Sequence, residues 1–191
     1  KGLIDAVNID LKCFSQSYYK SNLGGNLNQV LQNLKHFKKN DIWLEITTLL
    51  VPGKNDSKDE LEKIAKFIKE ELDEFTPWHI SSFHPDYKDM HIPHTSMDSL
   101  QMAYKIGKEA GLKYVYIGNT SLQNDTLCPN CNHTVLKRNR FEVIENSIKN
   151  GKCPKCNYKI QGVYPQMKTI RKTGFAGSFY PDNKEEILKY I

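Results

Sequence analysis

Four of the five cysteines form two Cys-x-x-Cys pairs, and this spacing constrains the fold more than any other feature of the sequence. The pairs are Cys128/Cys131 and Cys153/Cys156, with 21 residues between them. Two residues between cysteines let both sulfurs of a tight turn face one point, so two such turns complete a tetrahedral four-thiolate shell. The segment has few apolar residues for a core of its own, and we expect its folding to depend on a bound metal.

The spacing leaves the identity of the metal open. Four thiolates leave no open coordination position, which favours a structural metal over a catalytic one. Zinc fits this ligand set, and iron in a rubredoxin-like centre fits it too. His133 lies close to the first pair, and we interpret it as a bystander. Cys13 belongs to neither pair, and we expect it to be a lone buried thiol.

The residues before the cysteine pairs alternate strand and helix patterns. Helices alternating with strands are typical of right-handed βαβ units, which build a parallel sheet or barrel with helices outside. Four strand patterns are too few for a closed barrel of eight units. The sequence therefore predicts an α/β fold that forms part of a barrel, with strands near 6–11, 43–51, 78–83 and 114–117 and helices near 27–37, 57–72 and 95–111.

Composition divides the chain into three parts. We predict an α/β domain over 1–120, a four-cysteine metal ribbon over 121–162, and a basic linker with the start of a further domain over 163–191. The first residue is Lys1, and a helix pattern that opens at Asp182 stops at Ile191, so we expect the chain to come from a longer protein.

Composition also sets expectations for location and partners. No apolar run approaches the roughly 18 residues of a membrane helix, and no secretion leader is readable. Paired cysteines without a leader favour the reducing cytoplasm. The net charge of +5 comes without a dense basic run. It therefore permits contact with nucleic acid without arguing for it.

Charged residues stand at the ends of two predicted strands. Asp10 and Lys12 close the first strand and point to one side by alternation, and His84 follows the strand near 78–83. Ligands bind beyond the carboxyl ends of parallel strands, so a carboxylate and an ammonium there can bind an amino-acid-like ligand. A surface ion pair and a loop histidine are the plainer interpretations. A metal cluster of His84 with His91 and His94 lacks a convincing further ligand.

Together these segments resemble the second half of radical S-adenosylmethionine enzymes of the pyruvate formate-lyase activating type. The resemblance rests on Asp10-x-Lys12, on Leu-Val-Pro-Gly-x-Asn-Asp-Ser at 50–57 and on Phe83-His84. The sequence at 43–53, followed by a zinc-ribbon-like tail, is similar to that of the radical enzyme of the AmmeMemoRadiSam system. The run at 171–181 looks like the opening of a Memo-like protein, which accompanies that enzyme or is fused to it.

The resemblance implies a fold and a chemistry. The fold would be the carboxyl-terminal part of a partial (β/α)6 barrel, followed by the ribbon. Asp10 and Lys12 would bind the methionyl end of S-adenosylmethionine, and His84 would lie near its adenine. A [4Fe–4S] cluster and an external electron donor would cleave this cofactor reductively. The resulting 5′-deoxyadenosyl radical would abstract hydrogen from an unknown substrate, and that substrate could be a protein.

Several residues depart from the family pattern. No Cys-x-x-x-Cys-x-x-Cys run for the cluster is present, so its ligands would lie in a missing amino-terminal part and this chain alone would be inactive. Glu45 stands where the activating enzymes tend to carry a basic residue. Thr173-Gly174 replaces a usual Pro-Ala, and the metal-site histidines of Memo proteins are not reached.

The alternative function is a zinc-ribbon module that binds nucleic acid or protein on an α/β scaffold. A ribbon with basic flanks binds phosphate in a strongly salt-dependent way. Few aromatic residues lie near the ribbon to stack on bases, which makes nucleic acid the less favoured partner. A rubredoxin-like electron-transfer centre is a third interpretation. The basic flanks of the ribbon are Lys137, Arg138, Arg140, Lys168, Arg171 and Lys172.

Overall fold

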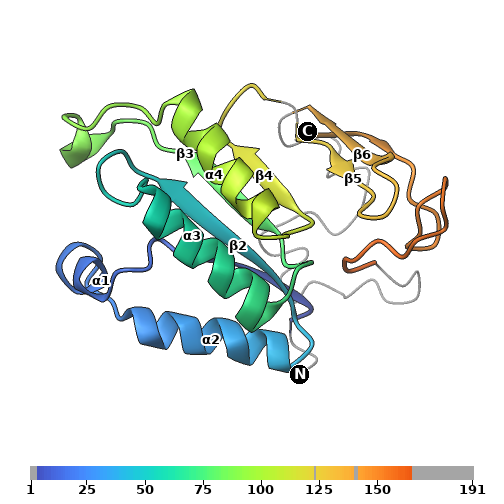
Figure 1. Ribbon diagram of the computed structural model, residues 1–191, viewed down its shortest axis with the longest axis horizontal. Coiled ribbons are helices and arrows are strands. Elements are labelled where there is room, and N and C mark those ends of the chain that lie inside the picture. Colours follow the sequence, from blue (N-terminus) through green and yellow to red (C-terminus); the bar gives the residue numbers. More distant parts are fainter. Residues whose placement is uncertain (1–3, 123, 140–141, 165–191) are drawn as a thin grey trace, which may run out of the picture.

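The computed structural model describes residues 4–122, 124–139 and 142–164. In its first part a four-stranded sheet carries helices on one face, and a smaller sheet lies beyond the last of these strands (Figure 1). The four strands pair in chain order and all run parallel. They are β1 (Ala6–Asp10), β2 (Trp43–Leu50), β3 (Trp78–Ser82) and β4 (Val115–Gly118).

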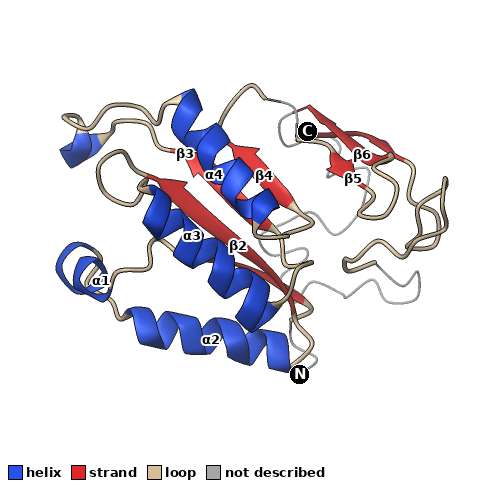
Figure 2. Ribbon diagram, in the orientation of Figure 1, coloured by secondary structure: helices blue, strands red, loops and turns tan. Residues whose placement is uncertain are grey.

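The predicted helices are present, and the structure adds short ones that the sequence analysis missed. The long helices α2, α3 and α4 lie over the sheet (Figure 2). A π-helical segment, η1, continues α3, and a short 3-10 turn, η2, follows β3. The helices are α1 (Gln16–Asn22), α2 (Leu27–Lys39), α3 (Lys58–Phe67), η1 (Ile68–Leu72), η2 (Tyr87–Asp89) and α4 (Met97–Glu109).

The core of the sheet lies under these helices. Along β2, Leu44, Ile46, Thr48 and Leu50 are fully buried, while Glu45, Thr47 and Leu49, which alternate with them, are half-buried. Because side chains alternate across a strand, β2 presents its apolar set to the helices and a polar set, including Glu45 and Thr47, to the opposite face. We call this second face the open face of the sheet. It is the side on which functional groups are available.

The ends of the helices follow local sequence signals closely. Ser57 caps α3 by accepting a hydrogen bond from the N–H of Glu60, as the capping pattern predicts. Helix α4 begins one residue later than predicted, with Ser96 as its cap. Thr95 is buried, and its hydroxyl donates to the carbonyl of Leu50. Gly111, with φ +93°, ends α4 as expected.

The cysteine-rich segment folds as a small antiparallel sheet. Its strands are β5 (Thr126–Leu127), β6 (Thr134–Asn139) and β7 (Glu142–Asn146), in that order. Val135 and Ile160 pack with two of the cysteines in a core separate from that of the parallel sheet. The segment therefore has little apolar support besides its sulfurs, as expected for a metal ribbon.

The α/β class and the parallel sheet are confirmed. Closure into a partial barrel and the domain boundaries at 120 and 162 stay predictions. The basic linker and the motif at 171–181 lie outside the described residues. None of the helices in the described ranges has both the length and the apolar character needed to cross a lipid bilayer.

Candidate functional site

The four paired cysteines converge on one point in the ribbon. All four Sγ atoms lie within 4.8 Å of one another. The Sγ atoms of Cys128 and Cys156 are 3.6 Å apart, and those of Cys131 and Cys153 are 3.7 Å apart. These separations are far longer than a disulfide bond of about 2.05 Å. They match the edge of about 3.8 Å in a tetrahedron whose metal–sulfur bonds are about 2.3 Å.

Two similar turns build this centre. In the first, the N–H of Cys128 donates to the carbonyl of His133 at 2.8 Å, and the N–H of Asn132 donates to Cys128 at 2.9 Å. In the second, Tyr158 and Asn157 make the same two bonds with Cys153, both at 2.9 Å. Both asparagines have a positive φ, which asparagine tolerates well. The sequence Cys-Pro-x-Cys-Asn thus specifies one turn twice and aims its sulfurs inward.

The cysteine environments differ before any metal binds. Burial raises the pKa of the Cys128 thiol. A hydrogen bond with the Asn130 side chain, followed by one with the backbone of Tyr158, lowers the pKa of Cys156 to about 6. His133 is not part of the cluster, which agrees with its interpretation as a bystander. The donor set of four sulfurs fits zinc or iron and leaves no position for a substrate.

A second group of charged residues lies at the carboxyl end of β1. The Nζ of Lys12 is 2.8 Å from Oδ2 of Asp10, and the two side chains are 37% and 49% exposed. They therefore meet on one side of the chain, as alternation predicts. An exposed ion pair contributes little to stability, so this pair can exchange its mutual contact for a ligand.

Asn55 holds this end of β1 against the end of β2. Its side-chain nitrogen donates to the carbonyls of Lys12 and Leu49, and its oxygen accepts from the N–H of Val51. Asn55 is only 3% exposed. The Val-Pro-Gly-x-Asn-Asp stretch is therefore more than a turn with a helix cap, because its asparagine fixes the backbone that carries Lys12.

His84 lies beyond the carboxyl end of β3 and is exposed. Its Nδ1 donates to the carbonyl of Pro85 at 2.8 Å. Its ring stacks on that of His94, with centroids 6.1 Å apart. Within the described ranges, the histidines at 84, 91 and 94 form no metal-binding group of three or more ligands. His84 shares the carboxyl edge of the sheet with Asp10 and Lys12, and no contact joins it to them.

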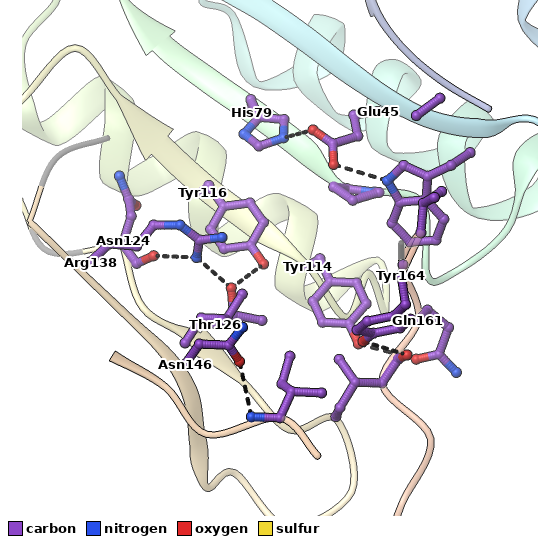
Figure 3. A pocket seen from close by; sticks show the side chains of 18 of the residues that line it. Glu45, His79, Tyr114, Tyr116, Asn124, Thr126, Arg138, Asn146, Gln161 and Tyr164 are labelled. Carbon is purple, nitrogen blue, oxygen red and sulfur yellow. Dashed lines mark hydrogen bonds and ion pairs between the residues drawn. The ribbon is translucent and has the colours of Figure 1, made fainter. Parts of the chain in front are cut away.

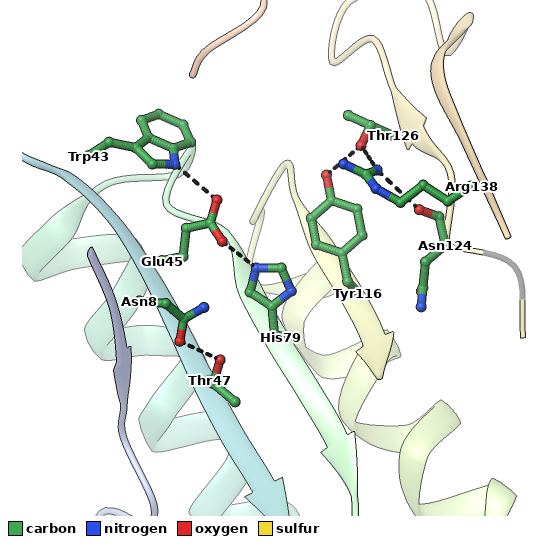
Figure 4. A network of polar contacts seen from close by, with 9 residues as sticks. All are labelled: Asn8, Trp43, Glu45, Thr47, His79, Tyr116, Asn124, Thr126 and Arg138. Atoms are coloured by element: carbon green, nitrogen blue, oxygen red, sulfur yellow. Dashed lines mark hydrogen bonds and ion pairs between the residues drawn. The ribbon is translucent and has the colours of Figure 1, made fainter. Parts of the chain in front are cut away.

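The open face of the sheet carries a polar network that the sequence analysis did not single out as a site. Glu45 accepts from the indole N–H of Trp43 at 3.0 Å and contacts Nε2 of His79 at 2.9 Å (Figure 4). The hydrogen bond with His79 is the main cause that holds the pKa of Glu45 below its usual value. Glu45 is therefore a carboxylate at neutral pH, and His79 donates through Nε2.

Tyr116 extends this network to the ribbon. The His79 ring stacks on the Tyr116 ring at 5.2 Å, and the Arg138 guanidinium lies 5.8 Å from the same ring. Figure 4 shows Tyr116 between these two side chains. The Tyr116 hydroxyl is 3.0 Å from that of Thr126, which also accepts from Arg138 at 2.6 Å. The ribbon thus rests on the open face through polar and aromatic contacts.

A cavity of about 630 Å³ lies between the open face and the ribbon. Figure 3 shows Glu45 and His79 on one of its sides and Tyr114, Gln161 and Tyr164 on another. Most of its sheet residues come from the beginnings of the strands, whereas Asp10 is the last residue of β1 and Lys12 follows it. The cavity and the ion pair therefore occupy opposite edges of the sheet.

Sequence patterns gave a partial signal for this cavity. Glu45, His79 and Tyr116 each take an alternate position on a strand, which by itself is typical of a solvated face. The signal that could have identified them is their coincidence: a carboxylate, an imidazole and a phenol occupy the same face of three strands in succession. Their contact depends on strand register, which the sequence does not state.

The comparisons with known proteins support the fold. No family model matches the chain. Over 161 residues, or 82% of its length, it is 41% identical to the uncharacterized protein MJ0808 of Methanocaldococcus jannaschii. The match covers 48% of that protein, so the chain spans about half the length of the curated relative it matches.

Among solved structures, the chain is similar to a domain of a pyruvate-formate lyase-activating enzyme from Bacteroides vulgatus. The TM-score is 0.51 at 20% identity, and the match covers 60% of this chain and 68% of that domain. At this identity the likeness shows a shared fold.

Proposed function

We propose that the α/β part of this chain belongs to a radical S-adenosylmethionine enzyme, as the carboxyl-terminal part of a partial (β/α)6 barrel. The observation that carries the proposal is the fold: four parallel strands in chain order share their architecture with a domain of a pyruvate-formate lyase-activating enzyme. The chemistry-bearing residues at the carboxyl edge support it, because parallel α/β folds bind their ligands there.

The residues at this edge fit the amino-acid end of S-adenosylmethionine. The carboxylate of Asp10 matches an ammonium group, and the ammonium of Lys12 matches a carboxylate. Both are accessible, and Asn55 fixes the backbone between them and β2. His84 would lie near the adenine, as the family resemblance implies. These residues would bind and orient the cofactor.

The reaction itself would need groups that this chain does not contain. With a [4Fe–4S] cluster, the bound cofactor supplies a 5′-deoxyadenosyl radical for hydrogen abstraction. The sequence has no Cys-x-x-x-Cys-x-x-Cys run, and its only cysteine outside the ribbon, Cys13, is buried. The cluster would therefore be held by polypeptide outside these 191 residues, and an external donor would reduce it.

The ribbon would have a structural role beside this chemistry. Its four sulfurs fit a closed tetrahedral site, which supports a metal that folds the segment and does not bind substrate. The proposal includes both a protein and a small molecule as the substrate class. A following Memo-like domain, membership of the AmmeMemoRadiSam system and a cytoplasmic location belong to the proposal on sequence grounds alone.

A zinc-ribbon module that binds nucleic acid or protein is the alternative. One of the basic residues that it would use, Arg138, faces the cavity between the ribbon and the sheet, where it contacts Tyr116 and Thr126. This placement favours the enzyme proposal.

The test uses the complete protein encoded by the reading frame that contains these residues, purified without oxygen and with its cluster reconstituted. With a reductant and S-adenosylmethionine we expect 5′-deoxyadenosine, and none from the 191-residue chain alone. Asp10→Asn and Lys12→Ala should each weaken cofactor binding at least about tenfold, since each removes a charged hydrogen-bond partner.

The control is Asp59→Asn, which removes a more exposed ion pair with Lys63 on α3 and should leave binding unchanged. A reconstituted complete protein that neither binds nor cleaves S-adenosylmethionine would overturn the proposal. Equal binding by the Asp10→Asn and Asp59→Asn proteins would remove the assigned role of the ion pair.

A further inference from the structure

The cavity under the ribbon has the properties of a small-molecule site distinct from the carboxyl edge. Its volume of about 630 Å³ falls in the range of about 300–1,000 Å³ that ligand sites occupy. Its walls include four aromatic side chains together with several polar ones, among them Glu45, His79 and Arg138. The aromatic residues are Trp43, Tyr114, Tyr116 and Tyr164. Such walls favour a planar ring.

Arg138 supplies a cation to this cavity. Its Nη1 donates to the Thr126 hydroxyl at 2.6 Å and to the carbonyl of Asn124 at 3.4 Å. In the part of the chain that the structure describes, no carboxylate pairs with its guanidinium. Among the described residues the N–H groups at Nε and Nη2 make no hydrogen bond, and this fork matches the two oxygens of a carboxylate or phosphate.

His79 offers a second hydrogen-bonding atom. Its Nε2 is bonded to the Glu45 carboxylate, so Nε2 carries a proton. Nδ1 takes part in none of the hydrogen bonds among the described residues. His79 lines the cavity with its ring held between Glu45 and Tyr116. A ligand hydroxyl, which can either donate or accept, can bond to this fixed nitrogen.

From these three features we propose that the cavity binds a planar ring that carries an oxyanion, with the oxyanion on Arg138 and a hydroxyl group of the ring on Nδ1 of His79. The two anchors lie on either side of Tyr116 (Figure 4), so the ring spans the edge of that residue. The assignment uses no residue of the Asp10–Lys12 edge and needs no S-adenosylmethionine.

The ribbon makes this site dependent on the metal. Arg138, Ile148 and Ile160 line the cavity from the ribbon side, and without the ribbon the open face of the sheet has no opposite wall. Since the fold of a four-cysteine ribbon depends on its metal, removing the metal should abolish ligand binding.

The experiment titrates the zinc-loaded 191-residue chain with 4-hydroxybenzoate and 4-hydroxyphenyl phosphate, with 4-hydroxybenzyl alcohol as the neutral control. Trp43 reports binding by fluorescence because it lines the cavity, whereas Trp78 is 0% exposed. A Trp43→Phe protein should lose the signal. For ligands of this size we expect dissociation constants of about 1 mM for the tighter anion and at least about tenfold weaker binding of the alcohol.

Substitutions locate the two anchors. Arg138→Gln should abolish the preference for the anions, while Lys137→Gln, which removes the same charge from the next position of β6, should keep it. His79→Gln should weaken the binding of 4-hydroxybenzoate. It should leave the binding of benzoate, which lacks the ring hydroxyl, unchanged. Which of the two anions binds more tightly distinguishes a carboxylate ligand from a phosphate ligand.

Binding of the alcohol as tightly as the anions would overturn the proposal, as would an anion preference that survives Arg138→Gln. If that variant loses its metal, Arg138→Lys keeps the charge without the fork and serves instead, and an undiminished affinity in it would overturn the bidentate contact. Because no S-adenosylmethionine is present, failure here leaves the proposed function untouched.

Discussion

The side-chain amide of Asn55 donates a hydrogen bond of 2.5 Å to the main-chain carbonyl of Lys12, which lies 43 positions earlier in the chain. The same side chain closes the turn after β2 through Val51 and Leu49. One buried residue therefore joins the exits of two neighbouring strands. It places the Asp10–Lys12 pair on a rigid support instead of a free loop.

Asn55→Ala should lower the free energy of unfolding by about 2–4 kcal/mol, because it leaves buried backbone groups without partners. Urea unfolding followed by circular dichroism measures this loss. The control, Asn33→Ala, removes an exposed side chain that, among the described residues, hydrogen-bonds to Gln29 on α2. It should change stability by less than about 0.5 kcal/mol. Similar losses in both proteins would contradict the role given to Asn55.

Cys128→Ser should remove the bound metal from the ribbon and leave the helices of the parallel sheet folded. The two cores share no residue, so loss of one does not expose the other. Elemental analysis measures the metal, and far-ultraviolet circular dichroism follows the helices. Iron would also give visible absorption, which zinc does not.

The control for this prediction is Cys13→Ala, which removes the cysteine outside the cluster. It should keep the full metal content. If the Cys128→Ser and Cys13→Ala proteins lose metal to the same degree, the four clustered sulfurs are not the ligands.

Gly107→Ala should destabilise the protein although alanine is the better helix former by about 1 kcal/mol. A Cβ at this position of α4 would lie 3.0 Å from both Trp78 and Val115. Trp78 is fully buried, and its indole N–H donates to Thr48 at 3.0 Å, so its ring has no room to move. We expect a net loss of about 1–2 kcal/mol.

Gln101→Ala, at an exposed position of the same helix, is the control and should be neutral within about 0.5 kcal/mol. Thermal unfolding of both proteins, compared at one pH, makes the measurement. If the Gly107→Ala protein is more stable, Trp78 and Val115 can shift to make room for the added methyl group.

Local signals made most of the fold predictable. Apolar periodicity and capping residues such as Ser57 predict a helix or strand from residues that lie only a few positions apart. The alternation of these strands and helices along the chain then predicts the parallel sheet. The start of α4 shows the limit of such signals. Thr95 and Ser96 are both good caps, and the choice between them depends on the distant carbonyl of Leu50, to which Thr95 donates.

The candidate sites divide in the same way. The cysteine cluster was predictable because each pair lies within one turn, and the separation of Asp10 and Lys12 by one residue places them together. The contact between Glu45 and His79 was not predictable, because these residues are 34 positions apart and meet only through the register of β2 and β3. Whether Asp10, Lys12 and His84 bind a cofactor stays a prediction.

The order of the strands has a consequence for biosynthesis. Each strand of the parallel sheet pairs with the strand nearest to it in the chain, so every new strand–helix unit finds its partner already made. These four strands can therefore assemble from β1 to β4 as the polypeptide leaves the ribosome. The ribbon follows β4 in the chain, so capture of its metal closes the cavity after these four strands have paired.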